Sequence, residues 1–107
     1  MDNDFNLDVV TVLKEHKEYF YKGETRDINF RIKQLNKLKA AIIKYEKEIS
    51  DALHKDLHKS EFEAYATEIG FLLDSISYMS KNLKAWAKTK RVKTPIAQLG
   101  AKSYVYL

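Results

Sequence analysis

A long run of apolar residues at helical spacing constrains the fold of this chain most. Between residues 25 and 59 there is neither glycine nor proline. The apolar positions in this run are Ile28, Ile32, Leu35, Leu38, Ile42, Tyr45, Ile49, Leu53 and Leu57. Their average step of about 3.6 residues is typical of an α-helix with one apolar face. The pattern predicts either one helix of about 30 residues or two helices with a bend near Tyr45–Lys47.

A first helix is predicted within residues 1–23. The side chain of Asp4 or Asn6 can accept hydrogen bonds from the free N–H groups of its first turn. Gly23 can end it, because glycine readily adopts the left-handed conformation that terminates many helices. Thr25–Asp27 then supplies capping side chains for the run that follows.

A third helix is predicted over residues 60–88. Ser60 and Glu63 form a capping box, in which each side chain can bond the backbone N–H of the other residue. Gly70 lies in the middle of this helix, and the close approach of another helix would explain its presence. Two heptad registers follow the cap: Phe62, Ile69, Ile76 and Leu83 in one, and Tyr65, Leu72, Met79 and Trp86 in the other.

The residues after the third helix predict a basic linker over 89–100 and one strand over 101–107. The basic side chains are Lys88, Lys90, Arg91 and Lys93. Pro95 cannot continue a helix, whereas the ending Ser-Tyr-Val-Tyr-Leu is rich in strand-forming residues. No second strand is predicted earlier in the chain, so the pairing partner of this strand is expected in the rest of a longer protein or in a second subunit. The predicted class is mostly α: three to four long amphipathic helices, the linker and one C-terminal strand, as a single unit.

Composition excludes several kinds of chemistry. The 107 residues contain no cysteine, so they hold no disulfide, no thiolate metal site and no cysteine nucleophile. The three glycines are too far apart to form a phosphate-binding loop. No apolar run reaches the ~18 residues of a membrane span, and no signal peptide is recognisable at the N-terminus. We therefore expect a cytoplasmic protein without a transmembrane segment.

A pair of histidines is the main candidate for a metal site. His54 and His58 are four residues apart, with Asp51 and Asp56 nearby. Two histidines one helical turn apart can share a metal ion, but no third ligand is evident. We expect both histidines to be partly exposed beside the apolar face, and we predict no metal ligand.

The other charged clusters also have structural explanations. Glu61 and Glu63 suit the start of a helix, and Glu68 is either an ion-pair partner or exposed. The basic residues 88–93 could contact phosphate, although no reading helix or aromatic platform accompanies them. We therefore predict no catalytic or cofactor-binding residue and no nucleic-acid partner. The alternative function is a stand-alone helical or coiled-coil interaction module that uses the heptads of residues 62–86 to bind a partner helix or itself.

Several motifs, taken in order, resemble the N-terminal segment of aldehyde dehydrogenases, in particular the class-3 or fatty-aldehyde branch. The resemblance lies in RIKQLNKLKAAIIKYEKEISDALHKDLHKSEFEAYATEI (Arg31–Ile69), LKAWAK (Leu83–Lys88) and KTPIAQLGAKSYVYL (Lys93–Leu107). It extends over about 90% of the chain, which would be the N-terminal helical part of a cofactor-binding domain. No single motif carries the resemblance, but their order is specific.

The resemblance implies an enzyme that oxidises an aldehyde to a carboxylate, and its branch suggests a fatty or other medium- to long-chain aldehyde. In that family a cysteine thiolate attacks the carbonyl, hydride passes to NAD or NADP, and a glutamate activates water for thioester hydrolysis. None of these groups can be assigned within residues 1–107, so the chain would be a non-catalytic fragment of an α/β enzyme. Its expected partners are the rest of the enzyme chain or a second subunit. An isolated fragment should self-associate, through residues 103–107 or by helix exchange.

Overall fold

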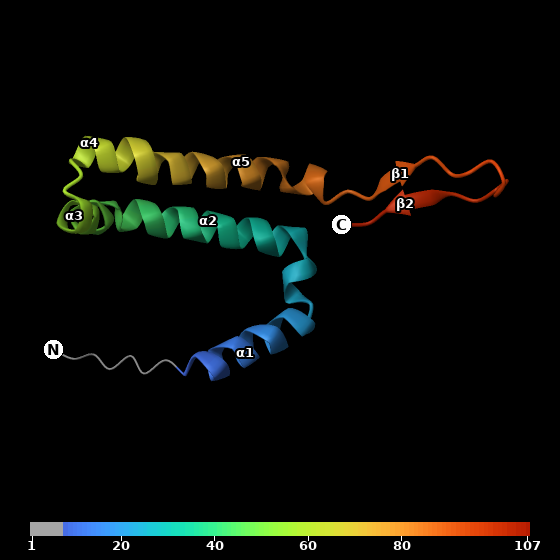
Figure 1. Ribbon diagram of the computed structural model, residues 1–107, viewed down its shortest axis with the longest axis horizontal. Coiled ribbons are helices and arrows are strands. Elements are labelled where there is room, and N and C mark those ends of the chain that lie inside the picture. Colours follow the sequence, from blue (N-terminus) through green and yellow to red (C-terminus); the bar gives the residue numbers. More distant parts are fainter. Residues whose placement is uncertain (1–7) are drawn as a thin grey trace.

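We describe the chain from a computed structural model, in which residues 8–107 are defined. These residues are mostly helical, as predicted, and a short sheet follows the last helix (Figure 1). None of the helices among them is long and apolar enough to span a bilayer. In order, the elements are α1 (Val9–Tyr21), η1 (Glu24–Arg26), α2 (Ile28–Lys44), α3 (Glu46–Leu57), α4 (Glu61–Ala64), the π-helical turn η2 (Tyr65–Ile69), α5 (Gly70–Trp86), β1 (Lys90–Val92) and β2 (Ser103–Val105).

Helix α1 begins at an aspartate cap and ends at a glycine. The Asp8 carboxylate accepts a hydrogen bond from Val10 N–H at 3.2 Å. The predicted caps, Asp4 and Asn6, lie outside the described residues. Gly23 has a φ of 79°, so the predicted termination by a left-handed glycine is confirmed.

The second helical stretch forms two helices, which decides between the two alternatives that the sequence left open. Asp27 caps α2 by accepting from Asn29 N–H at 3.0 Å, as predicted. At Tyr45 the backbone leaves helical geometry, with φ −102° and ψ 18°. Tyr45 N–H still donates to Ala41 O at 3.0 Å. The chain therefore bends at Tyr45 without losing this hydrogen bond.

The third predicted helix contains an irregularity that the sequence does not show. Its cap is confirmed, since Ser60 Oγ accepts from Glu63 N–H at 3.2 Å. Residues 65–69 form a π-helical turn between α4 and α5, so the predicted uniform helix is wrong at this point. A Cβ atom on Gly70 would lie 3.0 Å from both Cε1 and the carbonyl oxygen of Tyr65. Gly70 therefore makes room for Tyr65, which belongs to the preceding helical turn. The close approach of another helix, which we expected here, is not the reason for this glycine.

Helices α2 and α5 lie side by side and form a helical hairpin (Figure 1). Its core consists of Ile42, Ile69 and Ile76, with Leu35, Ile49 and Leu73 packed around them. A hydrogen bond of 2.7 Å from Lys39 Nζ to Ser77 Oγ also joins the two helices.

Only the middle of one of the two predicted heptad registers faces this core. Ile69 and Ile76 of the first register are buried, but Leu72 and Met79 of the second are exposed. Leu73, one residue after Leu72, packs against the core in its place. On this side of α5, the residues that face the core therefore come one position later than the second register predicts.

The C-terminal strand has its partner inside the chain. Strands β1 and β2 pair antiparallel, with Lys90 opposite Val105 and Val92 opposite Ser103. A bond from Thr94 Oγ1 to Ser103 Oγ, 3.0 Å long, adjoins the pair. The expectation that this strand pairs only outside these residues is therefore wrong, and part of the predicted linker is strand. The error arose because strand pairing joins backbone groups, which Lys90 and Arg91 carry as well as any apolar residue.

The molecule is elongated and leaves much of its surface open. It measures 68 × 36 × 22 Å and has a radius of gyration of 20.9 Å. A compact chain of this length would have a radius of about 13 Å. Its accessible surface of 9662 Å² compares with about 6,200 Å² for a compact monomer of this mass. Figure 1 shows that α1 and the sheet project from the α2–α5 hairpin, and the accessible surface exceeds that of a compact monomer by about 3,500 Å².

Candidate functional site

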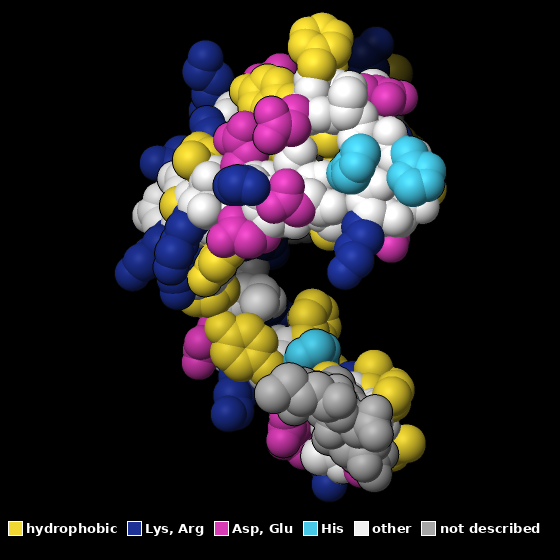
Figure 2. All heavy atoms as spheres, turned by 90° about the vertical axis from the view of Figure 1, so that its left-hand side faces the viewer, with side chains coloured by type: hydrophobic (Ala, Val, Ile, Leu, Met, Phe, Trp, Pro, Cys, Tyr) yellow, Lys and Arg dark blue, Asp and Glu magenta, His cyan; other side chains and the backbone are white. Residues whose placement is uncertain are grey.

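The two candidate metal-binding histidines lie together on the surface. Their rings are 6.0 Å apart and roughly edge-to-face, and Figure 2 shows two neighbouring histidine side chains on the end of the hairpin. His54 Nδ1 lies 3.0 Å from Lys59 O, whereas His58 caps α3 in a left-handed conformation. Asp51 instead pairs with Lys47 at 2.9 Å. Within residues 8–107 no three histidine, aspartate or glutamate side chains gather as metal ligands.

The acidic residues around the start of α4 have structural partners. Glu61 and Glu63 lie in its first turn, where negative charge stabilises the helix dipole. Glu68 forms an ion pair with Lys59, whose Nζ also lies 3.3 Å from Thr67 Oγ1. Of the two alternatives for Glu68, the structure therefore shows the ion pair.

The basic residues near the C-terminus lie on and beside strand β1. Lys90 and Arg91 are part of this strand, and Lys88 and Lys93 flank it. All four side chains are exposed. Charged residues on an edge strand hinder pairing with further strands, which gives this cluster a structural explanation.

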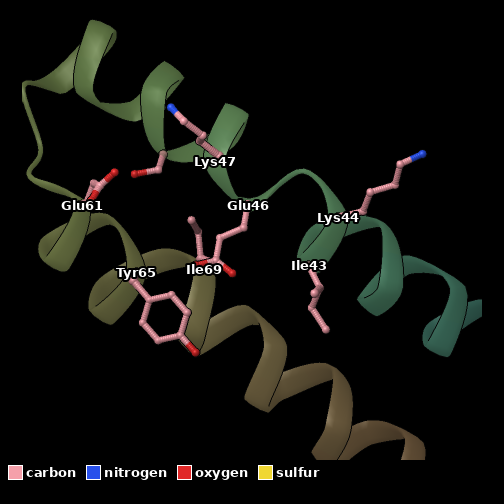
Figure 3. Close-up of a pocket in the computed structure, with 8 residues that line it drawn as sticks. Ile43, Lys44, Glu46, Lys47, Glu61, Tyr65 and Ile69 are labelled. Atoms are coloured by element: carbon pink, nitrogen blue, oxygen red, sulfur yellow. The ribbon is translucent and has the colours of Figure 1, made fainter.

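A mixed-charge pocket lies where the bend at Tyr45 faces the π-helical turn. Its volume is about 340 Å³, and Figure 3 shows the side chains around it. Lys47 lies at this pocket, and its pKa is raised, chiefly by its hydrogen bond to Asp51 and by the attraction of that carboxylate. The lining residues are Ile43, Lys44, Glu46, Lys47, Ser50, Glu61, Tyr65 and Ile69. Two lysines and two glutamates are among them, so the formal charge of the lining is zero.

The most distinctive surface is apolar and lies on α5. A groove of about 610 Å³ runs along this helix. We call it the α5 groove, and it is lined by Phe71, Asp74, Ser75, Tyr78, Met79 and Trp86. The rings of Tyr78 and Trp86 lie 5.6 Å apart within it. The groove was not predicted from the sequence, although Phe71 and Tyr78 recur seven residues apart beside the register of Leu72 and Met79.

The amino-acid sequence is similar to those of aldehyde dehydrogenases. The 4,4'-diaponeurosporen-aldehyde dehydrogenase of Staphylococcus aureus is 50% identical over 91 residues, which are 85% of this chain and 20% of that protein. The dimeric NADP-preferring aldehyde dehydrogenase of Canis lupus familiaris is 42% identical over 88 residues, 81% of this chain and 19% of that protein. Family 3 member A2 of Pongo abelii is 34% identical over 89 residues, 83% of this chain and 18% of that protein. The chain thus spans about one fifth of the length of these relatives, and no protein-family profile matches it.

A solved structure has the same fold over most of this chain. The substrate-bound state of Staphylococcus aureus AldH matches with a TM-score of 0.89 and 46% identity. The match includes 92% of this chain and 21% of that chain. The remaining 8%, about nine residues, is shorter than the 13 residues of α1, so at least part of α1 lies within the shared fold. By sequence and by fold, this chain is therefore an aldehyde dehydrogenase segment, homologous to about one fifth of such a protein.

Proposed function

We propose that residues 1–107 form, as one unit, the N-terminal helical part of the cofactor-binding domain of an NAD- or NADP-dependent aldehyde dehydrogenase. The observation that carries this proposal is that the open, elongated shape of this chain matches one segment of a much longer protein. An isolated chain with about 3,500 Å² of excess surface has the same fold as a segment of a protein about five times as long. Such a shape is expected if the rest of the polypeptide covers the projecting elements.

The role of these residues is to support the cofactor domain, while chemistry belongs to other parts of the enzyme. The buried isoleucines of the α2–α5 hairpin hold the two helices together. The exposed apolar side chains of α1, among them Val9, Val10 and Leu13, are then free to pack against the remaining chain. The thiolate that attacks the aldehyde has to lie elsewhere, because these residues contain no cysteine.

The names of two relatives support a proposal for the substrate class and the cofactor. One relative is named for a diaponeurosporen aldehyde and another for its preference for NADP and its dimeric state. We extend these properties to this protein: a long-chain or otherwise apolar aldehyde as substrate, NAD or NADP as hydride acceptor, and a dimeric enzyme in the cytoplasm.

The test is an activity assay on the longest reading frame that contains these residues. The purified product is incubated with aldehydes of increasing chain length and with NAD or NADP, and formation of the reduced cofactor is followed. We expect oxidation to the carboxylate by the long protein and none by residues 1–107 alone. A long protein that reduces neither cofactor with any aldehyde, or turnover by the isolated 107 residues, would contradict the proposal.

A stand-alone interaction module is a second candidate, favoured by the exposed α5 groove. A charged residue in the heptad stripe, such as Ile76→Asp, would be a poor test of this candidate. Ile76 is 2% exposed, so a buried aspartate there is expected to unfold the hairpin whether or not a partner binds. Exposed groove residues are the better probes of this candidate.

A further inference from the structure

The mixed-charge pocket at the bend of Tyr45 contains a buried hydroxyl group without a hydrogen-bond partner in the described chain. Ser50 is the one buried polar residue within residues 8–107, with 7% of its surface exposed, and it lines this pocket. The hydroxyl of Ser77 donates to Leu73 O at 2.9 Å, but the hydroxyl of Ser50 bonds to no residue in this part of the chain. Because buried polar groups are normally hydrogen-bonded, this hydroxyl is available to a ligand in the pocket.

The ammonium groups at this pocket are already engaged or directed elsewhere. Lys47 Nζ lies 2.9 Å from the carboxylate of Asp51, a residue that does not line the pocket. Lys44 Nζ lies 5.0 Å from the ring centre of Tyr45. Figure 3 shows the Lys44 side chain pointing away from Ile69. Neither lysine therefore presents a free positive charge to the interior of the pocket.

The carboxylates of the lining form no ion pair in the described chain. Glu46 and Glu61 belong to neither of the two ion pairs found within residues 8–107. Glu61 also raises the pKa of Lys47, but less than Asp51 does. When Asp51 is counted with its partner, three carboxylates accompany two ammonium groups, which gives a formal charge of −1. The excess charge at the pocket is therefore negative.

Apolar and aromatic side chains complete the walls. Ile69 is 3% exposed and belongs to the core of the hairpin, and Ile43 lines the pocket with it. Figure 3 shows the carboxylate of Glu46 directed toward Ile69. Tyr65, from the π-helical turn, adds an aromatic ring, and the faces of such rings attract cations. The volume of about 340 Å³ lies within the range of about 300–1,000 Å³ that is typical of small-molecule sites.

We infer that this pocket binds a small primary alkylammonium ion. Its ammonium group donates to the Ser50 hydroxyl and to the carboxylates of Glu46 and Glu61, and its alkyl chain lies against Ile43 and Ile69. A primary ammonium has three N–H donors, one for each of these acceptors. An anion would meet like charge, and within residues 8–107 no three metal-binding side chains gather. The inference is independent of the proposed enzymatic function.

The experiment is an NMR titration of the 107-residue chain with butylammonium chloride at constant ionic strength. The amide signals of residues 43–50 and 61–69 report on the pocket. We expect them to shift in a saturable manner, while the amides of α1 and of the sheet stay constant. 1-Butanol has the same alkyl chain without the charge, and butyrate carries the opposite charge. Each should shift the pocket amides by less than about one tenth as much at equal concentration, since neither offers charged N–H donors.

Neutral variants test the three acceptors. Glu46→Gln and Glu61→Gln keep the shape of the side chain but remove its charge, and each should raise the dissociation constant for butylammonium by about tenfold. Ser50→Ala removes the hydroxyl and should raise it by about threefold. The matched control is Glu48→Gln, because Glu48 lies on the same helix, is exposed and does not line the pocket. It should change the constant by less than about twofold. Circular dichroism verifies that every variant keeps its helices.

The outcomes are distinguishable. Absence of saturable shifts at the pocket amides would overturn the inference. Equal shifts with 1-butanol would also overturn it, because the apolar walls alone would then account for binding. Displacement of butylammonium by an equal concentration of Mg²⁺ would assign the pocket to a divalent cation instead. If Glu48→Gln weakened binding as much as Glu46→Gln, the attraction would be diffuse and not that of a site. Loss of aldehyde oxidation by the long protein bears only on the proposed function.

Discussion

The ring of Tyr65 lies directly against Gly70. An alanine Cβ at position 70 would be 3.0 Å from Cε1 and from the carbonyl oxygen of Tyr65, and 3.4 Å from Cδ1. Both residues belong to the junction of the π-helical turn and α5. π-Helical turns are rare and frequently occur at functional sites. Here the turn directs Tyr65 along its own backbone and into the lining of the pocket at the bend of Tyr45.

The first prediction follows from this contact. Gly70→Ala should lower the free energy of unfolding by about 1 kcal/mol, although alanine is the better helix former by about 1 kcal/mol. Overpacking commonly costs about 1–3 kcal/mol, which outweighs that gain. In a Tyr65→Ala background the ring atoms are gone, so the same substitution should cost less. Urea unfolding of the four chains measures the coupling, and stabilisation by Gly70→Ala alone would refute the close contact.

A second prediction concerns the core of the hairpin. Ile76 is 2% exposed and packs with Ile42 and Ile69, so Ile76→Ala should destabilise the chain by about 2–5 kcal/mol. Phe62→Ala removes a larger side chain that is 83% exposed and should change stability by less than about 0.5 kcal/mol. Thermal unfolding monitored by circular dichroism compares the two. Equal effects would mean that the buried isoleucines are not the main source of stability.

The third prediction tests the cap of α4. Ser60→Ala removes the acceptor for Glu63 N–H and should cost about 1 kcal/mol. Ser60→Asp supplies another good capping oxygen and should keep most of the stability. Amide hydrogen exchange localises the effect, since opening should increase at Glu63. Uniformly faster exchange along α2 would indicate a different cause.

The fourth prediction is a pH dependence at the start of α1. The pKa of Asp8 lies below its ordinary value of 3.8, chiefly because the Thr11 hydroxyl donates to the carboxylate, with a further bond from Val10 N–H. The ionised form is therefore favoured in the folded state. Its contribution to stability is present above about pH 3.8 and is lost as pH falls through the folded-state pKa. NMR should show the first turn of α1 fraying in acid, with Val10 and Thr11 amides shifting together.

Asp8→Asn is the control for that titration. Asparagine caps helices about as well as aspartate but does not titrate in acid. The first turn of the variant should therefore stay constant over the same pH interval. Fraying of the variant with the same midpoint would assign the transition to a different group.

Local signals in the sequence predicted the helix ends well. Asp27, Ser60 and Gly23 act through hydrogen bonds and backbone angles within a few residues, so their roles can be inferred without knowledge of the rest of the fold. The division at Tyr45 could not be decided in advance, because neither glycine nor proline marks it.

Most of the errors concern features that depend on distant partners, and the π-helical turn is a local exception. Steps of three and four residues continue through Tyr65–Ile69, so the π-helical turn leaves no trace in the apolar pattern. Leu73 was not distinguishable from Leu72 as a core residue until the position of α2 was known. Strand β1 was missed because two of its three side chains are charged, and its pairing with β2 depends on the backbone alone. The α5 groove was missed because the exposure of its residues depends on how the hairpin packs.

The hairpin that holds the buried isoleucines is built from one continuous stretch, residues 28–86. All its contacts can therefore form as soon as that stretch has left the ribosome, before any later strand of an α/β sheet is synthesised. Proteins dominated by contacts between sequence neighbours fold quickly, whereas parallel sheets wait for distant residues. In a growing dehydrogenase chain, these helices would supply an early nucleus against which slower elements assemble.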